Sequence, residues 1–129
     1  MDSEQPMRKQ VINPKGAPPP SGPYSRAIKF GNMIFLSGIS SRNPDGTSFH
    51  GSVEEETEKV LDSIRRILEG SGSAMAKVLK VTVILKDSED WSKMNSVYSK
   101  YFASEPPART TFQSDLGNAK VEMDAIAYV

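Results

Sequence analysis

One segment of the chain repeats its apolar positions every three or four residues, which is the spacing of one face of an amphipathic helix. Ser52 and Glu55 lie before this stripe at the spacing of a capping box, and Gly70 and Gly72 follow its last turn. We therefore predict a helix between them, with Glu54–Glu56 as dipole compensation on a solvated face rather than a metal or acid–base cluster. The stripe consists of Val53, Thr57, Val60, Leu61, Ile64, Ile67 and Leu68.

A second helix is predicted to begin at Asp87 or Ser88 and to stop before Pro106-Pro107. Its stripe is mostly aromatic, and an aromatic stripe at helical spacing usually belongs to a core. We assign five residues of this helix to the core on that basis: Trp91, Met94, Tyr98, Tyr101 and Phe102.

Six other segments have the length and patterning of β-strands, and they cover residues 8–12, 24–30, 32–37, 76–86, 108–114 and 119–128. Gly31-Asn32 predicts a hairpin between the second and third strands, and the turn at 115–118 predicts another between the last two. Segment 76–86 is predicted to be a central strand with apolar residues on both faces. One face carries Leu79, Val81, Val83 and Leu85, and the other carries Val78 and Ile84.

The order β-β-β-α-β-α-β-β predicts an α+β fold, in which two helices cover one face of a mixed sheet. The other face then keeps apolar side chains such as Val78 and Ile84 without cover. Because such a face makes a monomer prone to association, we expect a homo-oligomer that buries it. The 129 residues have room for one domain, expected over residues 8–129 after a flexible leader at 1–7.

Composition narrows the chemistry. The chain has 16 basic and 16 acidic side chains, and a formal charge of zero argues against a broad nucleic-acid surface. The lack of cysteine and the single histidine exclude disulfides, thiolate metal sites, a cysteine nucleophile and paired histidine ligands. No apolar run reaches the ~20 residues of a membrane span, and no signal peptide is recognisable at the start. We expect a soluble cytoplasmic protein.

Four residues are candidates for a site. Tyr24 follows a stiff Gly-Pro, and Ser37 ends an apolar strand; either could equally serve packing or a turn hydrogen bond. Arg109 follows Pro-Pro-Ala, and a rigidly placed guanidinium suits carboxylate or phosphate recognition. A hairpin of the last two strands would bring Glu122 close to Arg109. The residues alone allow two other interpretations. Arg109 could form an ion pair on the surface, and Arg109 with Glu122 could form a structural salt bridge.

Taken together, these segments resemble the Rid (YjgF-type) family of reactive-intermediate deaminases. The resemblance extends over most of residues 8–129. Its matching pieces are 22–27 (GPYSRA), 31–38 (GNMIFLSG), 78–87 (VLKVTVILKD), 95–98 (NSVY), 101–102 (YF), 107–109 (PAR) and 121–127 (VEMDAIA).

The resemblance implies a chorismate-mutase-like subunit and a homotrimer with a central barrel and active sites between subunits. It also implies hydrolysis of 2-imino or 2-enamino acids, such as 2-iminobutanoate or 2-iminopropanoate, to 2-oxo acids and ammonia, with no metal or organic cofactor. By position, Arg109 would clamp the substrate carboxylate and Glu122 would hold the attacking water, while Tyr24 and Ser37 would line the cleft. Because an imine carbon is already electrophilic, this chemistry needs little acid–base machinery, which suits a chain with one histidine and no cysteine.

Two departures concern the pocket. Thr111 stands where many members of the best-known branch have cysteine, and Ile39 stands where that branch has glutamine. Thr111 is still expected to contact the substrate. Residues 37–42, 44–45 and 109–111 are instead similar to the 2-aminomuconate deaminase branch, in which Arg42 would meet a second carboxylate. Two further functions stay open at this point. One is a non-catalytic trimer that binds small carboxylates, and the other is an endoribonuclease or translation inhibitor, against which the neutral charge argues.

Overall fold

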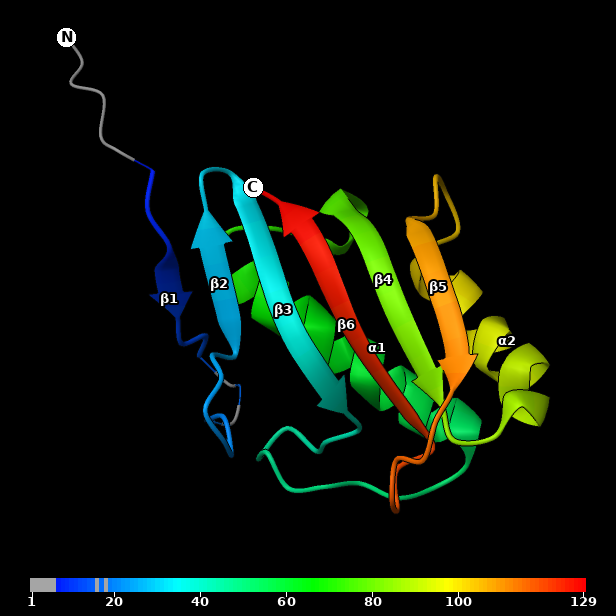
Figure 1. Ribbon diagram of the computed structural model, residues 1–129. Coiled ribbons are helices and arrows are strands. Elements are labelled where there is room, and N and C mark those ends of the chain that lie inside the picture. Colours follow the sequence, from blue (N-terminus) through cyan, green and yellow to red (C-terminus); the bar gives the residue numbers. More distant parts are fainter. Residues whose placement is uncertain (1–6, 16, 18) are drawn as a thin grey trace, which may run out of the picture.

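A computed structural model describes residues 7–129 except 16 and 18, so the predicted leader lies, apart from Met7, outside the described residues. Its centre is a six-stranded sheet in the order β1-β2-β3-β6-β4-β5 (Figure 1). All neighbours are antiparallel except β4 and β5. The strands are β1 (Gln10–Ile12), β2 (Ala27–Phe30), β3 (Met33–Ser40), β4 (Val78–Leu85), β5 (Ala108–Gln113) and β6 (Val121–Tyr128).

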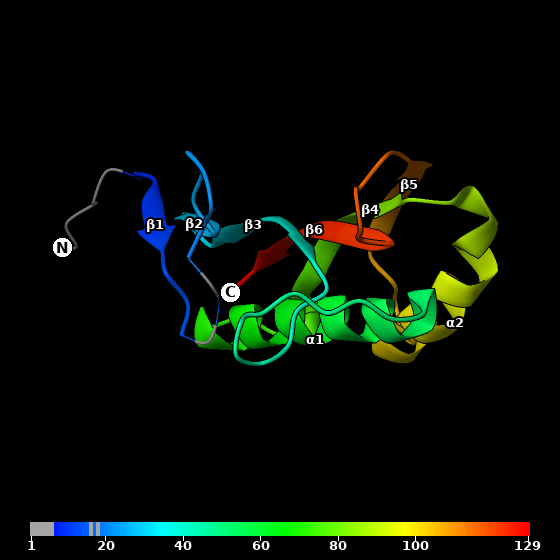
Figure 2. The ribbon, with the colours of Figure 1, turned by 90° about the horizontal axis from the view of Figure 1, so that it is seen from below.

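Both long helices lie on the same face of the sheet, α1 (Val53–Gly70) and α2 (Trp91–Tyr101), as Figure 2 shows. Short 3-10 turns at Met75–Lys77 and Ser88–Asp90 precede β4 and α2. The core fills the space between α1, α2 and the inward face of the sheet, and its fully buried members include Ile34, Leu61, Ile64, Leu68, Leu85, Met94 and Met123. The predicted α+β class and the two helices on one face are confirmed.

The first helix begins as its sequence predicts, but one member of its acidic triplet is not solvated. Ser52 and Glu55 form the complete capping box. Glu56 is fully buried, and its carboxylate accepts hydrogen bonds from the backbone N–H groups of Gly51 at 3.1 Å and Lys120 at 2.9 Å. The Nζ of Lys120 lies 3.8 Å away from it. The solvated-face interpretation is therefore wrong for Glu56, because a carboxylate with these donors can be buried.

The predicted faces of Val78 and Leu79 and the core assignment of Trp91 are also wrong. The pairing of β4 with β6 shifts register between Val78 and Lys80, which exchanges the faces at the start of the strand. Val78 is therefore buried, while Leu79 is exposed. In α2, Trp91 is 46% exposed; it occupies the first position of the helix, whose buried residues are Met94, Val97 and Tyr98.

The last two strands do not form the predicted hairpin. β5 pairs with β4 in parallel, with α2 as the crossover between them, and β4 pairs with β6 on its other edge. β4 therefore lies between β5 and β6. A parallel partner reached through a helix is the usual connection for such a segment, and it leaves β5 at the edge of the sheet.

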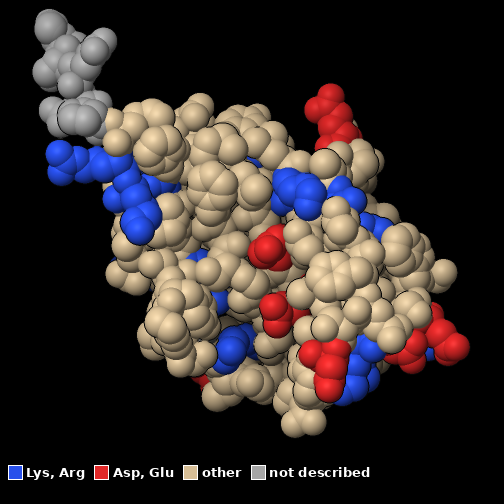
Figure 3. Space-filling view, viewed as in Figure 1, with Lys and Arg blue, Asp and Glu red and all other residues tan. Residues whose placement is uncertain are grey.

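No helix of the described residues lies over the second face of the sheet, which is mostly uncharged (Figure 3). Directly paired residues share a face, so Val11, Ile28, Phe35 and Ile126 form one apolar row from β1 to β6. Phe35, Phe112 and Tyr128 are each more than a third exposed. Acidic side chains lie near the middle of the face (Figure 3), where β6 contributes Glu122 and Asp124 by alternation. Ile84 belongs to this face as predicted; Val78 does not.

Candidate functional site

Arg109 lies at the start of β5 on the side of the sheet that faces the helices. It pairs with Val81, which is buried against the core. Its Nη1 donates a 2.7 Å hydrogen bond to the Oδ1 of Asn95, and its Cζ lies 4.7 Å from the ring centroid of Tyr98 and 5.2 Å from that of Trp91. Trp91, Asn95 and Tyr98 are spaced i, i+4, i+7, so one face of α2 holds the guanidinium.

The guanidinium is held without being neutralised. Among the described residues no carboxylate forms an ion pair with Arg109, which argues against the surface ion pair that the residues left open. Asn95 supplies a neutral acceptor and the aromatic rings supply cation–π contacts. A positive charge placed in this way has N–H groups left for an external carboxylate or phosphate.

Two buried hydroxyls lie on the same side of the sheet. Thr111 pairs with the core residue Val83, two residues after Arg109. The Oγ1 of Thr111 and the hydroxyl of Tyr98 are both buried without a hydrogen-bond partner in the described part of the chain. Burial raises the pKa of Tyr98 to about 12, although the nearby Arg109 opposes that shift. Tyr98 is therefore neutral at physiological pH, and it does not form an ion pair with Arg109 in place of a bound anion.

Glu122 lies on the opposite, uncovered face of the sheet. It pairs with Ser40 of β3 and with Ile84 of β4. A Cβ atom at Gly38 would lie 2.6 Å from the Oε2 of Glu122, so the carboxylate rests directly against the glycine backbone. No hydrogen bond or ion pair reaches this carboxylate from the residues described here. It is therefore an acceptor available to a ligand or a water.

Ser37 and Tyr24 lie near the same end of the sheet as Gly38. The Oγ of Ser37 donates a 2.6 Å hydrogen bond to the carbonyl of Ser25, and the Ser37 N–H donates to the carbonyl of Arg26 at 3.1 Å. The ring of Tyr24 is 43% exposed and lies 5.6 Å from the Cζ of Arg26. Hydrogen bonds from Ser21 lower the pKa of Tyr24. Ser37 thus fixes the local backbone, and Tyr24 presents a ring to solvent.

Arg109 and Glu122 do not meet within one chain, contrary to the prediction of a close pair. β4 separates their strands, which places them about 10 Å apart along the sheet by strand spacing alone, and they point to opposite faces. The structural salt bridge between them is therefore wrong as well. We call Arg109, Thr111, Asn95, Tyr98 and Trp91 the arginine half, and Glu122, Gly38, Ser37 and Tyr24 the glutamate half.

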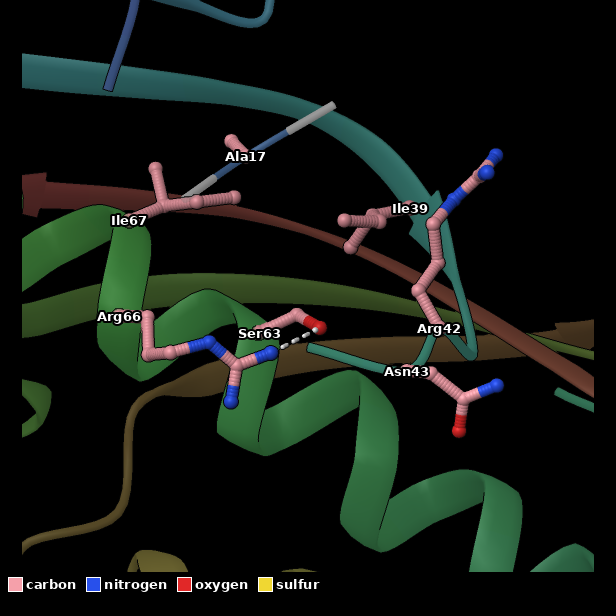
Figure 4. Close-up of a pocket in the computed structure, with 7 residues that line it drawn as sticks. All are labelled: Ala17, Ile39, Arg42, Asn43, Ser63, Arg66 and Ile67. Atoms are coloured by element: carbon pink, nitrogen blue, oxygen red, sulfur yellow. Dashed lines mark hydrogen bonds between the residues drawn. The ribbon is translucent and has the colours of Figure 1, made fainter. Parts of the chain in front are cut away.

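Arg42 belongs to neither half. Its Nη1 donates to the carbonyl of Gly46 in its own loop at 3.1 Å. It lines a small cavity between α1 and the end of β3, where its guanidinium points away from that of Arg66 (Figure 4). Arg66 instead donates to the Oγ of Ser63 at 3.3 Å. None of the other predicted site residues lines this cavity.

The sequence reasoning missed Asn95 and Gly38 and placed Trp91 and Tyr98 only in the core. The signal was present for three of these four: Trp91, Asn95 and Tyr98 share one face of a predicted helix, and an amide among aromatic residues stands out on such a face. Gly38 had no comparable signal, since its close approach to Glu122 depends on the pairing of β3 with β6.

The described residues contain no group of three histidine, cysteine or acidic side chains that could hold a metal ion. In the same part of the chain, no helix has the length and apolarity needed to cross a membrane.

Comparison with known proteins finds a matching family model and relatives that are similar to this chain over most of its length. The family model described as "Endoribonuclease L-PSP" matches residues 14–129. A RutC family protein of Pyrococcus abyssi is 45% identical over 95% of this chain and 98% of its own. The chloroplastic Reactive Intermediate Deaminase A of Arabidopsis thaliana is 41% identical over 94% of this chain and 66% of its own. The 3-aminoacrylate deaminase RutC of Acinetobacter baylyi is 35% identical over 95% of this chain and 100% of its own.

Among solved structures, the crystal structure of the YjgF gene product from E. coli superposes with a TM-score of 0.86. It is 30% identical in sequence, and the match covers 92% of this chain and 98% of that one.

Proposed function

The chain belongs to the Rid family, also called the YjgF or L-PSP family, and from that premise we propose that it is a cofactor-independent deaminase of 2-imino and 2-enamino acids. Relatives named as a reactive intermediate deaminase and as a 3-aminoacrylate deaminase support this reaction class. The observation that carries the proposal is the guanidinium of Arg109, which is fixed by Asn95 and two aromatic rings and has no carboxylate partner among the described residues.

The chemistry needs few groups. An enamine becomes the imine when its C3 takes up a proton and its nitrogen gives one up, and water then adds to C2 of the imine. The carbinolamine that forms loses ammonia, so one imine and one water give one 2-oxo acid and one ammonia. Arg109 would orient the carboxylate, and Glu122 would hold the attacking water and pass its proton toward the departing nitrogen. Because the imine carbon is already electrophilic, orientation and one base are sufficient.

We propose further that the reaction takes place between copies of the chain in a homotrimer. Two observations support this arrangement. The halves of the site face opposite sides of the sheet, so a second copy must bring a glutamate half to each arginine half. The uncovered face, with Phe35, Phe112 and Tyr128 exposed, also needs a partner. In this arrangement Tyr24 and Ser37 would line the cleft from one copy and Thr111 from the other.

The decisive experiment generates 2-iminobutanoate with a threonine dehydratase and follows its decay with and without the purified protein. Faster decay that disappears with Arg109→Ala is the expected result. Light scattering should give about three times the 14.1 kDa chain mass. Unchanged decay with every imino acid tested would contradict the deaminase, and a 14 kDa particle at micromolar concentration would contradict the trimer.

Three different results would point to a different function. Turnover of 2-aminomuconate would place the chain in that branch, with Arg42 as a second carboxylate contact only if a neighbouring copy brings it to the cleft. Binding of 2-oxobutanoate without turnover would indicate a carboxylate-binding trimer. RNA cleavage that Arg109→Ala abolishes would indicate an endoribonuclease. The cytoplasmic location also stays a prediction, since one relative is named as chloroplastic.

A further inference from the structure

Trp91 lies beside the guanidinium of Arg109 and yet remains open to solvent. The centroid of its ring is 5.2 Å from the Cζ of Arg109, and the residue is 46% exposed. The other ring at this guanidinium, that of Tyr98, is only 6% exposed. The arginine therefore has one aromatic neighbour inside the protein and one at the surface, and the surface one has area left for another contact.

The residues that contact the guanidinium of Arg109 determine the direction in which a bound molecule must extend. Asn95 occupies Nη1 of Arg109 and Tyr98 covers the guanidinium from the core side. A carboxylate bound to the remaining N–H groups must enter from outside the core. The rest of the molecule then begins two bonds from the carboxylate oxygens, on the open side where the indole of Trp91 lies.

We propose that Trp91 is a specificity-determining residue: its exposed indole beside Arg109 forms one wall for the substituent on C2 of the substrate. The site would then favour 2-imino acids with large planar or apolar substituents over 2-iminopropanoate. This inference rests on the proposed function, because it takes Arg109 as the carboxylate contact.

Kinetics with a series of imino acids test the inference. An amino-acid oxidase supplies them from phenylalanine, leucine and alanine, and their decay is followed with each variant. Trp91→Ala should lower kcat/KM about tenfold for the phenylalanine product and less than about threefold for the alanine product, as expected for loss of one aromatic contact. Trp91→Phe should restore most of the difference. Lys93→Ala, exposed on the same helix, should change neither.

The chain contains a single tryptophan, so its fluorescence gives a second readout that does not depend on turnover. Titration with 3-phenylpropanoate should change the emission of Trp91 at lower concentration than titration with propanoate, and Arg109→Ala should abolish both responses. If no imino acid is turned over but this difference persists, the deaminase proposal fails while the role of Trp91 in binding stands.

Two results would overturn the inference. One is an equal loss of kcat/KM for all three imino acids in Trp91→Ala, together with equal fluorescence responses to the two acids in the wild type. The other is that light scattering shows dissociation of the Trp91→Ala oligomer, while kcat/KM falls equally for all three imino acids. Trp91 would then be an interface residue.

Discussion

The arginine half and the glutamate half of the site are held in place in different ways. Arg109 is fixed by side chains of α2, through a hydrogen bond to Asn95 and the rings of Tyr98 and Trp91. Glu122 is fixed by backbone, because it lies on a central strand and rests against Gly38. The first half depends on side chains and orients a charge, whereas the second depends on the sheet and leaves an acceptor free. A binding group and a base need these different kinds of support.

The largest effect should come from removing the charge of the arginine half. We expect Arg109→Ala to lower kcat/KM about a thousandfold, since a charge-assisted pair is lost at a cost of roughly 4 kcal/mol. Arg109→Lys keeps the charge but loses the planar fork, so it should recover only part of that loss. Steady-state decay of 2-iminobutanoate measures both. An active Arg109→Ala protein would show that the two halves do not divide the work as described.

The glutamate half should affect turnover more than binding. Glu122→Gln keeps the shape of the side chain and removes its basicity, so kcat should fall about a hundredfold with little change in KM. Loss of Arg109 should instead raise KM.

Mixing the two inactive variants sharpens the comparison. If each site takes Arg109 from one copy and Glu122 from another, trimers reassembled from equal amounts of Arg109→Ala and Glu122→Gln should recover about a quarter of the wild-type activity by random assortment. No recovery, with mixed trimers verified by mass spectrometry, would contradict a site shared between copies.

The sequence predicted the secondary structure and the central residue of each half, but not how the halves are arranged. Periodicity identified both helices and all six strands, because apolar spacing reflects which face is buried. The stiff Pro-Pro-Ala before Arg109 and the expected hairpin made Arg109 and Glu122 candidates. The sequence did not show that they lie on opposite faces, because the position of β4 between β5 and β6 depends on long-range pairing that no local pattern encodes. The role of Asn95 was lost for a related reason, since the aromatic residues beside it favoured a core interpretation.

Glu56 of α1 accepts a hydrogen bond from the N–H of Lys120, just before β6, and its removal should reduce stability. Glu56→Ala leaves the N–H groups of Gly51 and Lys120 without their acceptor, so the free energy of unfolding should fall by about 3 kcal/mol. Glu54→Ala, from the same acidic triplet, should change it by less than about 0.5 kcal/mol. Urea denaturation at one fixed protein concentration measures both. Equal effects would show that burial does not distinguish the two glutamates.

Gly38 tests the backbone support of Glu122 directly. In Gly38→Ala the new methyl group would lie 2.6 Å from the Oε2 of Glu122, so the carboxylate must move aside. Because the end of a flexible side chain can move at small cost, we expect little change in stability but a fall of about tenfold in kcat. Gly117→Ala is an unsuitable control because Gly117 has a positive φ of 66°. Ser96→Ala, exposed on α2, is a better one. Unchanged kcat in Gly38→Ala would mean that the position of Glu122 against the glycine is not required.

The smallest effect at neutral pH is expected from Tyr98→Phe. The hydroxyl of Tyr98 has no partner among the described residues, while its ring lies against Arg109 and would remain, so kcat/KM at pH 7 should change less than about threefold.

Tyr98→Phe should change how the free energy of unfolding depends on pH, and it should do so only at alkaline pH. Burial raises the pKa of Tyr98 from 10.0 to about 12, so between these values the unfolded chain loses a proton that the folded chain keeps. The stability that the neutral phenol contributes is therefore complete below pH 10 and is lost as the pH rises toward 12. Tyr98→Phe should remove this part of the alkaline decline, as measured by urea denaturation at about pH 8, 10 and 11.5. Parallel declines in the wild type and the variant would show that the ring beside Arg109 is reached by water, and that the arginine half is less firmly held than its contacts imply.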